Sequence, residues 1–412
     1  MSYLKNKIIN DPIYGFVHIS FNIIWEIIEH PYFQRLRRIS QLGLSSLVYP
    51  GANHNRFHHA IGSMHLMNKA INILKLKGHT ITMEEHEASL IAILLHDIGH
   101  GPFSHALENS IVNNISHEQI SIMFMQQLNE KFKGKLSLAI KIFQKKYKKK
   151  FLQELISSQL DMDRLDYLNR DSFYSGVNEG IINSDRIIEM LNIKNNKLVV
   201  DYKGIYSIEK FIMARKLMYW QVYLHKTVLS AEHTLMNVLR RAKSLAKKNI
   251  KIYTTPPFQT FLYEKKKITS QFFQSNKLLN KFALIDDFDI LTCMKNWINQ
   301  EDKVLKILSE GIINRKLLKI SSITKSKKEY ELKKIRKQAR KKFQINEEEV
   351  KYLVFPITIK NETYNFNINE IKFLKKDSIL INLSDLKSEF SLNTQNSKII
   401  KHYICYPNEC LK

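Results

Sequence analysis

The sequence predicts a mainly α fold with a small α+β region at its C-terminal end. From about residue 20 to about residue 300, apolar residues recur at helical spacing with few glycines or prolines between them. Past about residue 340 the pattern changes to short runs rich in Val, Ile, Phe and Tyr, separated by Asn, Asp and Lys, which are typical of strands. We therefore expect a helical domain over residues 1–320, with an N-terminal hairpin and helical extensions, and a basic helix with a small α+β fold over residues 321–412.

The composition favours a folded, soluble protein. With 412 residues, 44% of them hydrophobic and 10% aromatic, the chain can bury a substantial core. No run approaches the roughly 18 apolar residues of a membrane span, and the N-terminus lacks the apolar segment of a signal peptide. The three cysteines, Cys293, Cys405 and Cys410, have no zinc-finger spacing and fit a reducing compartment. We expect a cytoplasmic protein that does not enter a membrane.

The net charge of +25 raises the question of an anionic partner. Much of it lies in two blocks, residues 131–151 and residues 325–342, and a basic field attracts nucleotides or nucleic acids. Neither block interleaves aromatic residues as a base-stacking platform does. Solvated helix faces explain the blocks better, so a nucleic-acid partner is possible but not favoured.

Two predicted helices precede the densest polar motif. The first has apolar residues three or four apart: Phe57, Ile61, Met64, Met67, Ile71 and Leu74. The second begins with a capping-box pattern at Thr82 and Glu85, is apolar on all sides over residues 90–95, and stops at the sequence GHGP of residues 99–102. His96 and Asp97 are therefore expected at the C-terminal end of a buried helix.

A second polar cluster, LDMDRLDYLNRDSFYSG, follows downstream. At about 100° per residue, one arc of a helix carries two carboxylates, a guanidinium and a phenol, whereas leucines point away. Such a face is costly to bury unless its charges are paired or coordinate something, and the alternative is a solvated surface stripe. The residues of this arc are Asp163, Arg164, Tyr167 and Asp171.

Together these helices offer ligands for a metal ion. The candidates are His59, His96, Asp97 and Asp163. Two imidazoles and two carboxylates suit an octahedral divalent ion such as Mn²⁺, Fe²⁺ or Mg²⁺ better than a closed zinc site. Four protein ligands leave positions open for water and substrate, which hydrolytic metal chemistry requires. We expect one divalent ion per active site.

Several motifs carry a resemblance to a known family. RFHH (residues 56–59), LHDIGHGPFSH (95–105), SHEQ (116–119) and DMDRLDY (161–167) resemble, in order and spacing, the HD-superfamily phosphohydrolases. NDPI (10–13), FQRLRRISQLG (33–43) and PGANHNRF (50–57) add to the match. The likeness covers about residues 5 to 300 and is greatest to the dNTP triphosphohydrolase branch, which includes the bacterial dGTPases and the metazoan SAM-and-HD-domain dNTPase. It implies an HD-domain helical bundle.

The resemblance also implies a reaction. A deoxynucleoside triphosphate, dGTP or another, would be hydrolysed to deoxynucleoside and inorganic triphosphate by attack at the α-phosphorus. The basic 5′ alkoxide needs a proton donor, for which His117 is the candidate by position, with His100 and His105 lining the same pocket. Arg56, Arg164 and Lys226 would supply cations to the polyphosphate.

Further positions would bind the sugar. In the family, the positions of Gln41, Leu42, Tyr167 and Asp171 surround the deoxyribose, with Gln41 and Asp171 reaching the 3′-hydroxyl. A side chain packed against the 2′ carbon would exclude ribose. The stretch FIMARKLMYWQVYLHKTV resembles a substrate-binding helix of the family, with Arg215, Tyr223 and Lys226 near one face. Related enzymes form dimers to hexamers, so a homo-oligomer is implied.

Departures from the family and other functions remain open at this point. The metazoan enzyme has aspartate at the position of Glu29 and histidine at that of Tyr219, so activation by a second nucleotide is not carried over. The alternatives are another HD phosphohydrolase, acting on a nucleoside monophosphate, guanosine tetraphosphate or a cyclic dinucleotide, a nucleic-acid binder or nuclease, and an inactive regulatory protein. A cyclic-dinucleotide enzyme would recruit His100 or His117 for a second metal ion.

Overall fold

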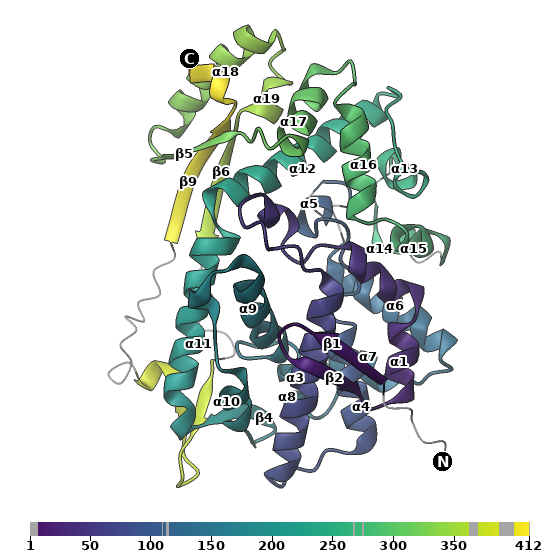
Figure 1. Cartoon of the computed structure of the whole chain (residues 1–412), viewed down its shortest axis with the longest axis vertical. Coiled ribbons are helices and arrows are strands. Elements are labelled where there is room, and N and C mark those ends of the chain that lie inside the picture. The colour runs from purple at the N-terminus through teal and green to yellow at the C-terminus, as the bar shows by residue number, and fades with distance from the viewer. Residues whose placement is uncertain are drawn as a thin grey trace.

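Three helices that carry the predicted polar residues pack together. A computed structural model describes residues 7–108, 110–112, 115–266, 268–273, 276–361, 370–386 and 399–411. In it, α3 (Arg56–Leu76) lies against both α4 (Met83–Leu94) and α9 (Met162–Ser175) in the lower half of Figure 1. Helices make up most of the described chain, which confirms the mainly α prediction.

Helix α4 follows the predicted pattern closely. Thr82 Oγ1 accepts a hydrogen bond from Glu85 N at 3.2 Å, and Glu85 Oε2 accepts one from Thr82 N at 2.9 Å, so the capping box is confirmed. The helix ends at Leu94, and turns follow over residues 95–99. A Cβ atom on Gly99 would lie 2.2 Å from the carbonyl oxygen of His117, so glycine lets this turn approach α6 (His117–Lys131).

Further helices complete the N-terminal and middle parts of the chain. Besides α3, α4 and α9, these parts contain α1 (Asn22–Ile28), α2 (Pro31–Gln34), α5 (His105–Glu108), α7 (Ser137–Phe143), α8 (Lys150–Glu154), α10 (Ser184–Glu189) and α11 (Ile205–Met218). In the upper half of Figure 1, the long helix α12 (Lys226–Lys247) packs against α17 (Lys303–Ile313), near α13 (Pro256–Leu262), α14 (Ser270–Phe273), α15 (Asn276–Ala283) and α16 (Asp287–Trp297).

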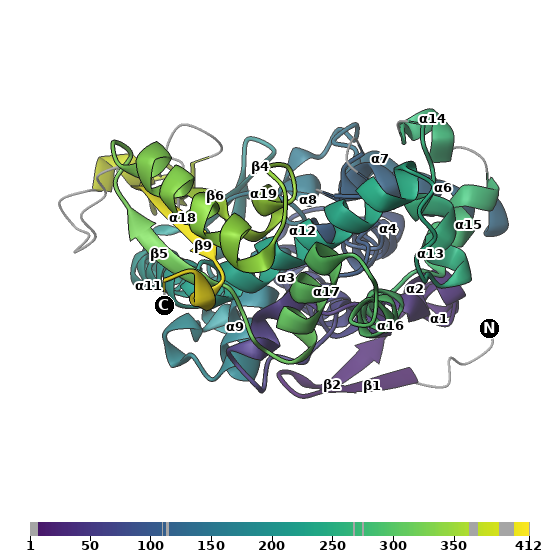
Figure 2. The same ribbon diagram turned by 90° about the horizontal axis from the view of Figure 1, so that it is seen from above.

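An antiparallel hairpin lies at the N-terminal end. Strands β1 (Lys7–Asp11) and β2 (Gly15–Ile19) pair along their whole length and form one edge of the molecule in Figure 2. Asp11 Oδ1 accepts the N–H groups of Ile13 and Tyr14 at 2.8 and 3.1 Å and so shapes the turn. Asp11 itself is only 2% exposed, which brings a carboxylate of the hairpin into the interior.

The C-terminal part forms two sheets. Strands β5 (Lys319–Ile323), β9 (Ile399–Tyr406) and β6 (Phe355–Asn361) make an antiparallel sheet in that order, beside α18 (Lys328–Phe343) and α19 (Val350–Leu353). Strands β7 (Lys372–Leu374) and β8 (Leu380–Asn382) instead extend the hairpin of β3 (Leu191–Lys194) and β4 (Lys197–Asp201), with β4 and β7 parallel. Strands β7 and β8 therefore belong to the same sheet as a hairpin from the helical part of the chain.

Several predictions about this region need correction. Residues 350–353 were expected in a strand but form α19, and the strand begins at Phe355. The hairpin of β3 and β4 interrupts a stretch expected to be helical. The predicted strand YNFNIN, residues 364–369, lies outside the described residues. The domain boundary at residue 320 stays a prediction, and β5 crosses that position.

The two basic blocks lie largely on helices. Residues 328–342 belong to α18, whose Ile335 and Ala339 are buried while most of its cationic side chains are exposed. Residues 131–151 span the end of α6, all of α7 and the start of α8. Within the described chain, this is the arrangement expected of solvated helix faces.

Candidate active site

The four predicted metal ligands come together between α3, the turn after α4, and α9. His59 Nε2 lies 3.1 Å from Asp163 Oδ1, and His96 Nε2 lies 3.6 Å from the same oxygen. Asp97 closes the group, since its Oδ1 is 3.4 Å from His96 Nε2 and its Oδ2 is 3.9 Å from His59 Nε2. Their role as ligands stays a prediction: His59, His96 and Asp163 form one group of ligand atoms, and Asp97 lies between this group and His100.

The unused atoms of this cluster fit a cation. The Nε2 atoms of His59 and His96 are buried, and neither has a hydrogen-bond partner of good geometry among the described residues. Their Nδ1 atoms are engaged, that of His96 with the carbonyl of Ile93 at 2.6 Å. Because Nδ1 is held, Nε2 presents its lone pair to the centre, as a metal-binding imidazole does. His59, His96 and Asp163 hold ligand atoms within 4.8 Å of one another.

The electrostatics of the site also favour positive charge at its centre. Burial lowers the pKa of His59, yet the nearby carboxylates of Asp163 and Asp166 raise it to about 10. Burial likewise opposes a charge on His96, whereas Asp97 raises its pKa. The pKa of Asp97 is held well below its usual range, against burial, chiefly by His96 and Arg56. Carboxylates that stabilise a proton here would also stabilise a divalent cation.

A buried ion-pair chain supports His59 from behind. Asp166 Oδ2 lies 2.7 Å from His59 Nδ1, and Arg170 donates to both oxygens of Asp166 at 2.9 Å. Arg170 also reaches Asp11 Oδ2 of the N-terminal hairpin at 2.9 Å. A Cβ atom on Gly62 would lie 2.0 Å from Asp166 Oδ1, so glycine in α3 makes room for this contact. This series of ion pairs fixes the ring orientation of His59.

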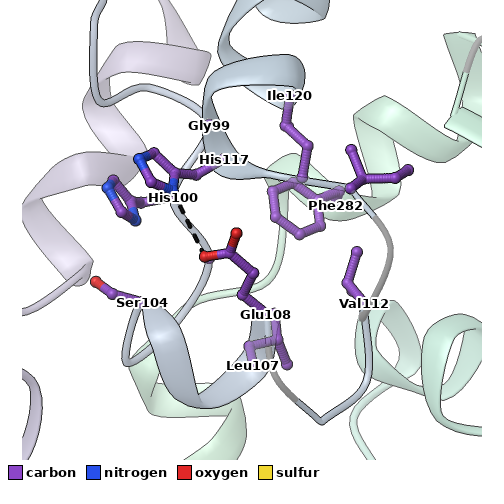
Figure 3. A pocket seen from close by; sticks show the side chains of 11 residues that line it. Gly99, His100, Ser104, Leu107, Glu108, Val112, His117, Ile120 and Phe282 are labelled. Atoms are coloured by element: carbon purple, nitrogen blue, oxygen red, sulfur yellow. Dashed lines mark ion pairs between the residues drawn. The ribbon is translucent and has the colours of Figure 1, made fainter. Parts of the chain in front are cut away.

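A pocket adjoins Asp97 on the other side. The rings of His100 and His117 stack at 3.9 Å, and Asp97 Oδ1 lies 3.4 Å from His100 Nε2. Figure 3 shows Glu108 reaching toward His117, whose Nδ1 is 3.5 Å from Glu108 Oε2. Apolar walls are formed by Leu107, Val112, Ile115, Ile120 and Phe282.

These two imidazoles differ in their protonation. Burial and the nearby Arg56 hold the pKa of His100 well below its usual range. Burial also lowers the pKa of His117, but the hydrogen bond to Glu108 outweighs it together with nearby carboxylates, so the pKa is raised. The predicted proton donor, His117, is therefore the ring whose pKa is raised. The third predicted pocket residue, His105, begins α5, and its side chain lies outside the described part of the structure.

Arg56 connects the two halves of the site. Its guanidinium pairs with Asp97 Oδ2 and donates to Ser104 Oγ at 2.6 and 3.1 Å. The side chain is buried, so the pair is held in place. A fixed cation beside the ligand cluster is suitably placed for an anionic substrate.

The predicted phosphate and sugar residues lie mainly along α9 and α11. Arg164 pairs with Asp161, which caps the start of α9. Arg215 is buried and donates to Gln159 Oε1 at 3.2 Å. Burial raises the pKa of Tyr167, against the charge of Arg215.

The helix expected to carry Arg215, Tyr223 and Lys226 is not continuous. Helix α11 ends at Met218, a π-helical turn η5 (Tyr219–Tyr223) follows, and α12 begins only at Lys226. The wider turn is closed by a hydrogen bond from Leu224 N to Tyr219 O at 2.8 Å. A single helical face for these residues was wrong because the π-turn changes the period between them.

The consequence differs for the two later residues. The Tyr223 hydroxyl donates to Asp171 Oδ2 at 2.8 Å and so points into the site. Lys226 is exposed, and its Nζ lies 5.9 Å from the centre of the Tyr403 ring in β9. No contact of Lys226 with the ligand cluster is found among the described residues.

Two of the remaining predicted sugar contacts, Gln41 and Leu42, come from the segment before α3, and the third, Asp171, lies in α9. Gln41 N donates to the carbonyl of His54 at 3.0 Å, and Gln41 Oε1 is buried. Leu42 is half-buried and precedes the short 3₁₀ helix η2 (Gly43–Leu47). Asp171 is 2% exposed.

Sequence reasoning missed the residues that support these groups. They are Asp11, His54, Glu108, Asp166 and Arg170. The spacing of Asp166 and Arg170, four apart in α9, was an available signal for a helical ion pair. Nothing in the sequence spacing joins Asp11 or His54 to α9.

Comparisons with known proteins agree with this fold. The HD domain family matches residues 56–171, and the HD associated region matches residues 182–275. The uncharacterized protein YwfO of Bacillus subtilis is 34% identical over 320 residues, which are 76% of this chain and 71% of that protein. A solved phosphohydrolase structure from Bacteroides thetaiotaomicron is 45% identical to this chain, with a TM-score of 0.92. The match covers 98% of this chain and 100% of that one.

A more distant relative has a named activity. The deoxynucleoside triphosphate triphosphohydrolase SAMHD1 homolog of Dictyostelium discoideum is 30% identical over 262 residues, which are 59% of this chain. The match spans 51% of that protein, about half of its length.

Helices α3, α4 and α9 around a His and Asp cluster define an HD domain, a type of domain that binds divalent metal ions. The chain belongs to the HD phosphohydrolase superfamily, which confirms the resemblance of its motifs. No helix among the described residues is long and apolar enough to cross a membrane.

Proposed function

We propose that this protein is a deoxynucleoside triphosphate triphosphohydrolase. The observation that carries the proposal is the shared use of Asp97, which faces His96 on one side and His100 of the proton-donor pocket on the other, each at 3.4 Å. The proposed ligand cluster and the proposed proton donor are thus adjacent, as hydrolysis with a basic leaving group requires. The named activity of the Dictyostelium relative supports the same substrate class.

His59, His96, Asp97 and Asp163 would hold one divalent ion, of which Mn²⁺, Fe²⁺ and Mg²⁺ fit the nitrogen and oxygen donors. When bound, the ion would supply Lewis-acid stabilisation of phosphoryl charge and activate water. The protein contributes the fixed orientation, through Asp166 behind His59 and the Ile93 carbonyl behind His96.

The proposed reaction breaks the bond between the α-phosphorus and the 5′ oxygen. A water oxygen forms the new bond to the α-phosphorus and releases its proton to the solvent, and triphosphate and deoxynucleoside separate. His117 donates a proton to the departing 5′ oxygen, a contribution of about 10² to 10⁴ in rate. Glu108 orients the ring at 3.5 Å, and His100, stacked on it at 3.9 Å, fixes its plane. His105 remains a predicted member of this pocket.

Substrate binding would use the cations and the sugar-facing groups. Arg56, Arg164 and Arg215 are proposed to bind phosphate oxygens, since a guanidinium can do so with two parallel hydrogen bonds. Lys226 would act as a point charge at longer range. Gln41, Leu42, Tyr167, Asp171 and Tyr223 are proposed to surround the deoxyribose, where an apolar wall at the 2′ carbon would leave a ribose hydroxyl without a partner.

Product analysis tests the proposal. The purified protein is incubated with each dNTP and rNTP in the presence of Mn²⁺, Mg²⁺ or Fe²⁺, alone and with other nucleotides as activators, and the products are separated by ion-exchange chromatography. Inorganic triphosphate from a dNTP is the expected result. Pyrophosphate, orthophosphate or no turnover under all conditions would contradict the proposal. Light scattering on the same sample tests the proposed homo-oligomer.

A second candidate function has one observation in its favour. Asp97, His100 and His117 form another group whose ligand atoms lie within 4.8 Å of one another. A second ion there would favour a two-metal HD phosphohydrolase acting on a cyclic dinucleotide. Two ions per chain by elemental analysis, with turnover of cyclic dinucleotides and not dNTPs, would decide for it.

A further inference from the structure

His54, in the loop that precedes α3, joins two parts of the proposed sugar site. Its side chain contacts α9, where Nε2 lies 2.7 Å from Asp171 Oδ1. Its backbone carbonyl accepts the N–H of Gln41 at 3.0 Å. One residue, itself 1% exposed, therefore fixes two groups from segments that are 130 positions apart in the sequence.

The hydrogen bonds define how Asp171 is held. Each oxygen of Asp171 has one partner: His54 Nε2 lies 2.7 Å from Oδ1, and the Tyr223 hydroxyl donates to Oδ2 at 2.8 Å. The His54 ring also stacks on Tyr174, with centroids 4.5 Å apart and planes at 15°. Ring plane and donor direction are thus both fixed before any ligand binds.

Gln41 differs from Asp171 in one respect. Its backbone is tied to His54, but its Oε1 is buried and has no hydrogen-bond partner within the described chain. A buried acceptor without a partner costs about 1–3 kcal/mol. A ligand hydroxyl is a donor that would satisfy Oε1, and it could accept or donate toward a carboxylate as well.

We propose that His54 is a positioning residue that sets Gln41 and Asp171 in register for the 3′-hydroxyl of the substrate sugar. The inference rests on the proposed function and deepens it, because it names the residue that makes the site discriminate between sugars with and without this hydroxyl. His54 does not contact the reacting atoms.

Discrimination between 2′-deoxy and 2′,3′-dideoxy substrates tests the inference. For the wild type, kcat/KM for a dNTP is expected to exceed that for the matching ddNTP by about 10- to 100-fold, the size of a hydrogen bond to a charged group. In His54→Phe, which keeps a stacking ring but no donor, the ratio should fall to within about threefold of unity. The loss should fall on the dNTP while ddNTP turnover stays within about threefold.

Conservative variants and a control sharpen the result. The amide nitrogen of His54→Gln can take the place of Nε2 and should restore most of the ratio, whereas His54→Asn is too short and should not. If His54→Phe does not fold, the comparison of His54→Gln with His54→Asn tests the inference instead. His79→Phe removes a comparable 2.7 Å contact, with Asn192 Oδ1, outside the site and should leave the ratio unchanged.

The outcomes separate this inference from the proposed function. If the wild type hydrolyses dNTPs and the His54 variants lose dNTP and ddNTP turnover equally, His54 is only structural and the inference is wrong. If the wild type hydrolyses no dNTP, the proposed function fails. The inference about His54 is then tested by calorimetry, which compares the affinity for a 2′-deoxynucleoside with that for the matching 2′,3′-dideoxynucleoside. Equal or absent binding of the two nucleosides then contradicts the inference.

Discussion

Two buried polar clusters in this molecule use similar residues to different ends. In the first, between α12, α17 and α19, Arg241 donates to Asp302 at 3.0 Å and to Glu349 at 2.8 Å, and Asp302 also caps α17. No nitrogen of Arg241 is left buried without a partner in the described chain. In the second, around His59 and His96, two imidazole nitrogens are left without one.

The difference shows which cluster is structural and which awaits a ligand. Each buried polar atom without a partner costs about 1–3 kcal/mol, so a fold keeps such atoms where something binds. The Arg241 cluster is complete without any ligand. The cluster of His59 and His96 leaves two nitrogens that a cation could bind, and substitutions should separate the two clusters.

The largest effect is expected from losing a ligand. His96→Ala or Asp97→Ala should lose metal and activity together while circular dichroism shows unchanged helical content. Metal affinity should fall by more than about 100-fold, because even partners behind the ligands contribute about 10- to 100-fold. Elemental analysis and triphosphate release measure both. A variant that keeps either one contradicts the ligand assignment.

Next in size is the loss of the proton donor. His117→Ala should lower kcat by about 10² to 10⁴ with little change in bound metal, because the 5′ alkoxide then leaves without its proton. Steady-state kinetics and elemental analysis of the same sample measure this. Equal loss of metal would instead place His117 among the ligands and support the two-metal alternative.

The matching change in the structural cluster should act on stability. Arg241→Ala leaves Asp302 and Glu349 without their partner and should destabilise the fold by about 1–3 kcal/mol, because both carboxylates are partly exposed to water. Chemical denaturation measures the loss, and kcat per folded molecule should stay at the wild-type value. A drop in the metal content of the folded fraction would contradict a purely structural role for the Arg241 cluster.

A smaller effect is expected behind the ligand. Asp166→Asn keeps the shape of the side chain but weakens its hold on His59 Nδ1, and metal affinity should fall by about 10- to 100-fold. Titration calorimetry on metal-free protein provides the measurement. Unchanged affinity would show that Asp166 and Arg170 serve the fold alone.

The smallest effect concerns pH. Because Glu108 raises the pKa of His117, removing its charge with Glu108→Gln should lower that pKa. A donor must be protonated, so activity falls as the pH rises through its pKa, and the variant should lose activity at a lower pH than the wild type. A pH profile of kcat tests this, and an unshifted alkaline limb would contradict the role of Glu108.

The sequence was most informative where the evidence is local. The capping box at Thr82 and Glu85 depends on neighbouring residues and is found. The predicted helix stop at Gly99 was wrong by one turn, because α4 ends at Leu94 and places His96 and Asp97 in the turn that follows. The arc from Asp163 to Asp171 depends on the helical period, and α9 is a helix over this range. Where a local rule is broken, as at the π-turn of Tyr219–Tyr223, the extrapolated face was wrong.

What the sequence by itself determined is the mainly α fold, the HD superfamily and the types of residue available to a divalent ion. Only the tertiary structure decided how they meet: that Arg170 links Asp11 to Asp166, that His54 reaches Asp171, and that β7 pairs with β4. Helical period and capping are properties of a few neighbouring residues, whereas these contacts join segments far apart in the chain, and their geometry comes from packing the whole core.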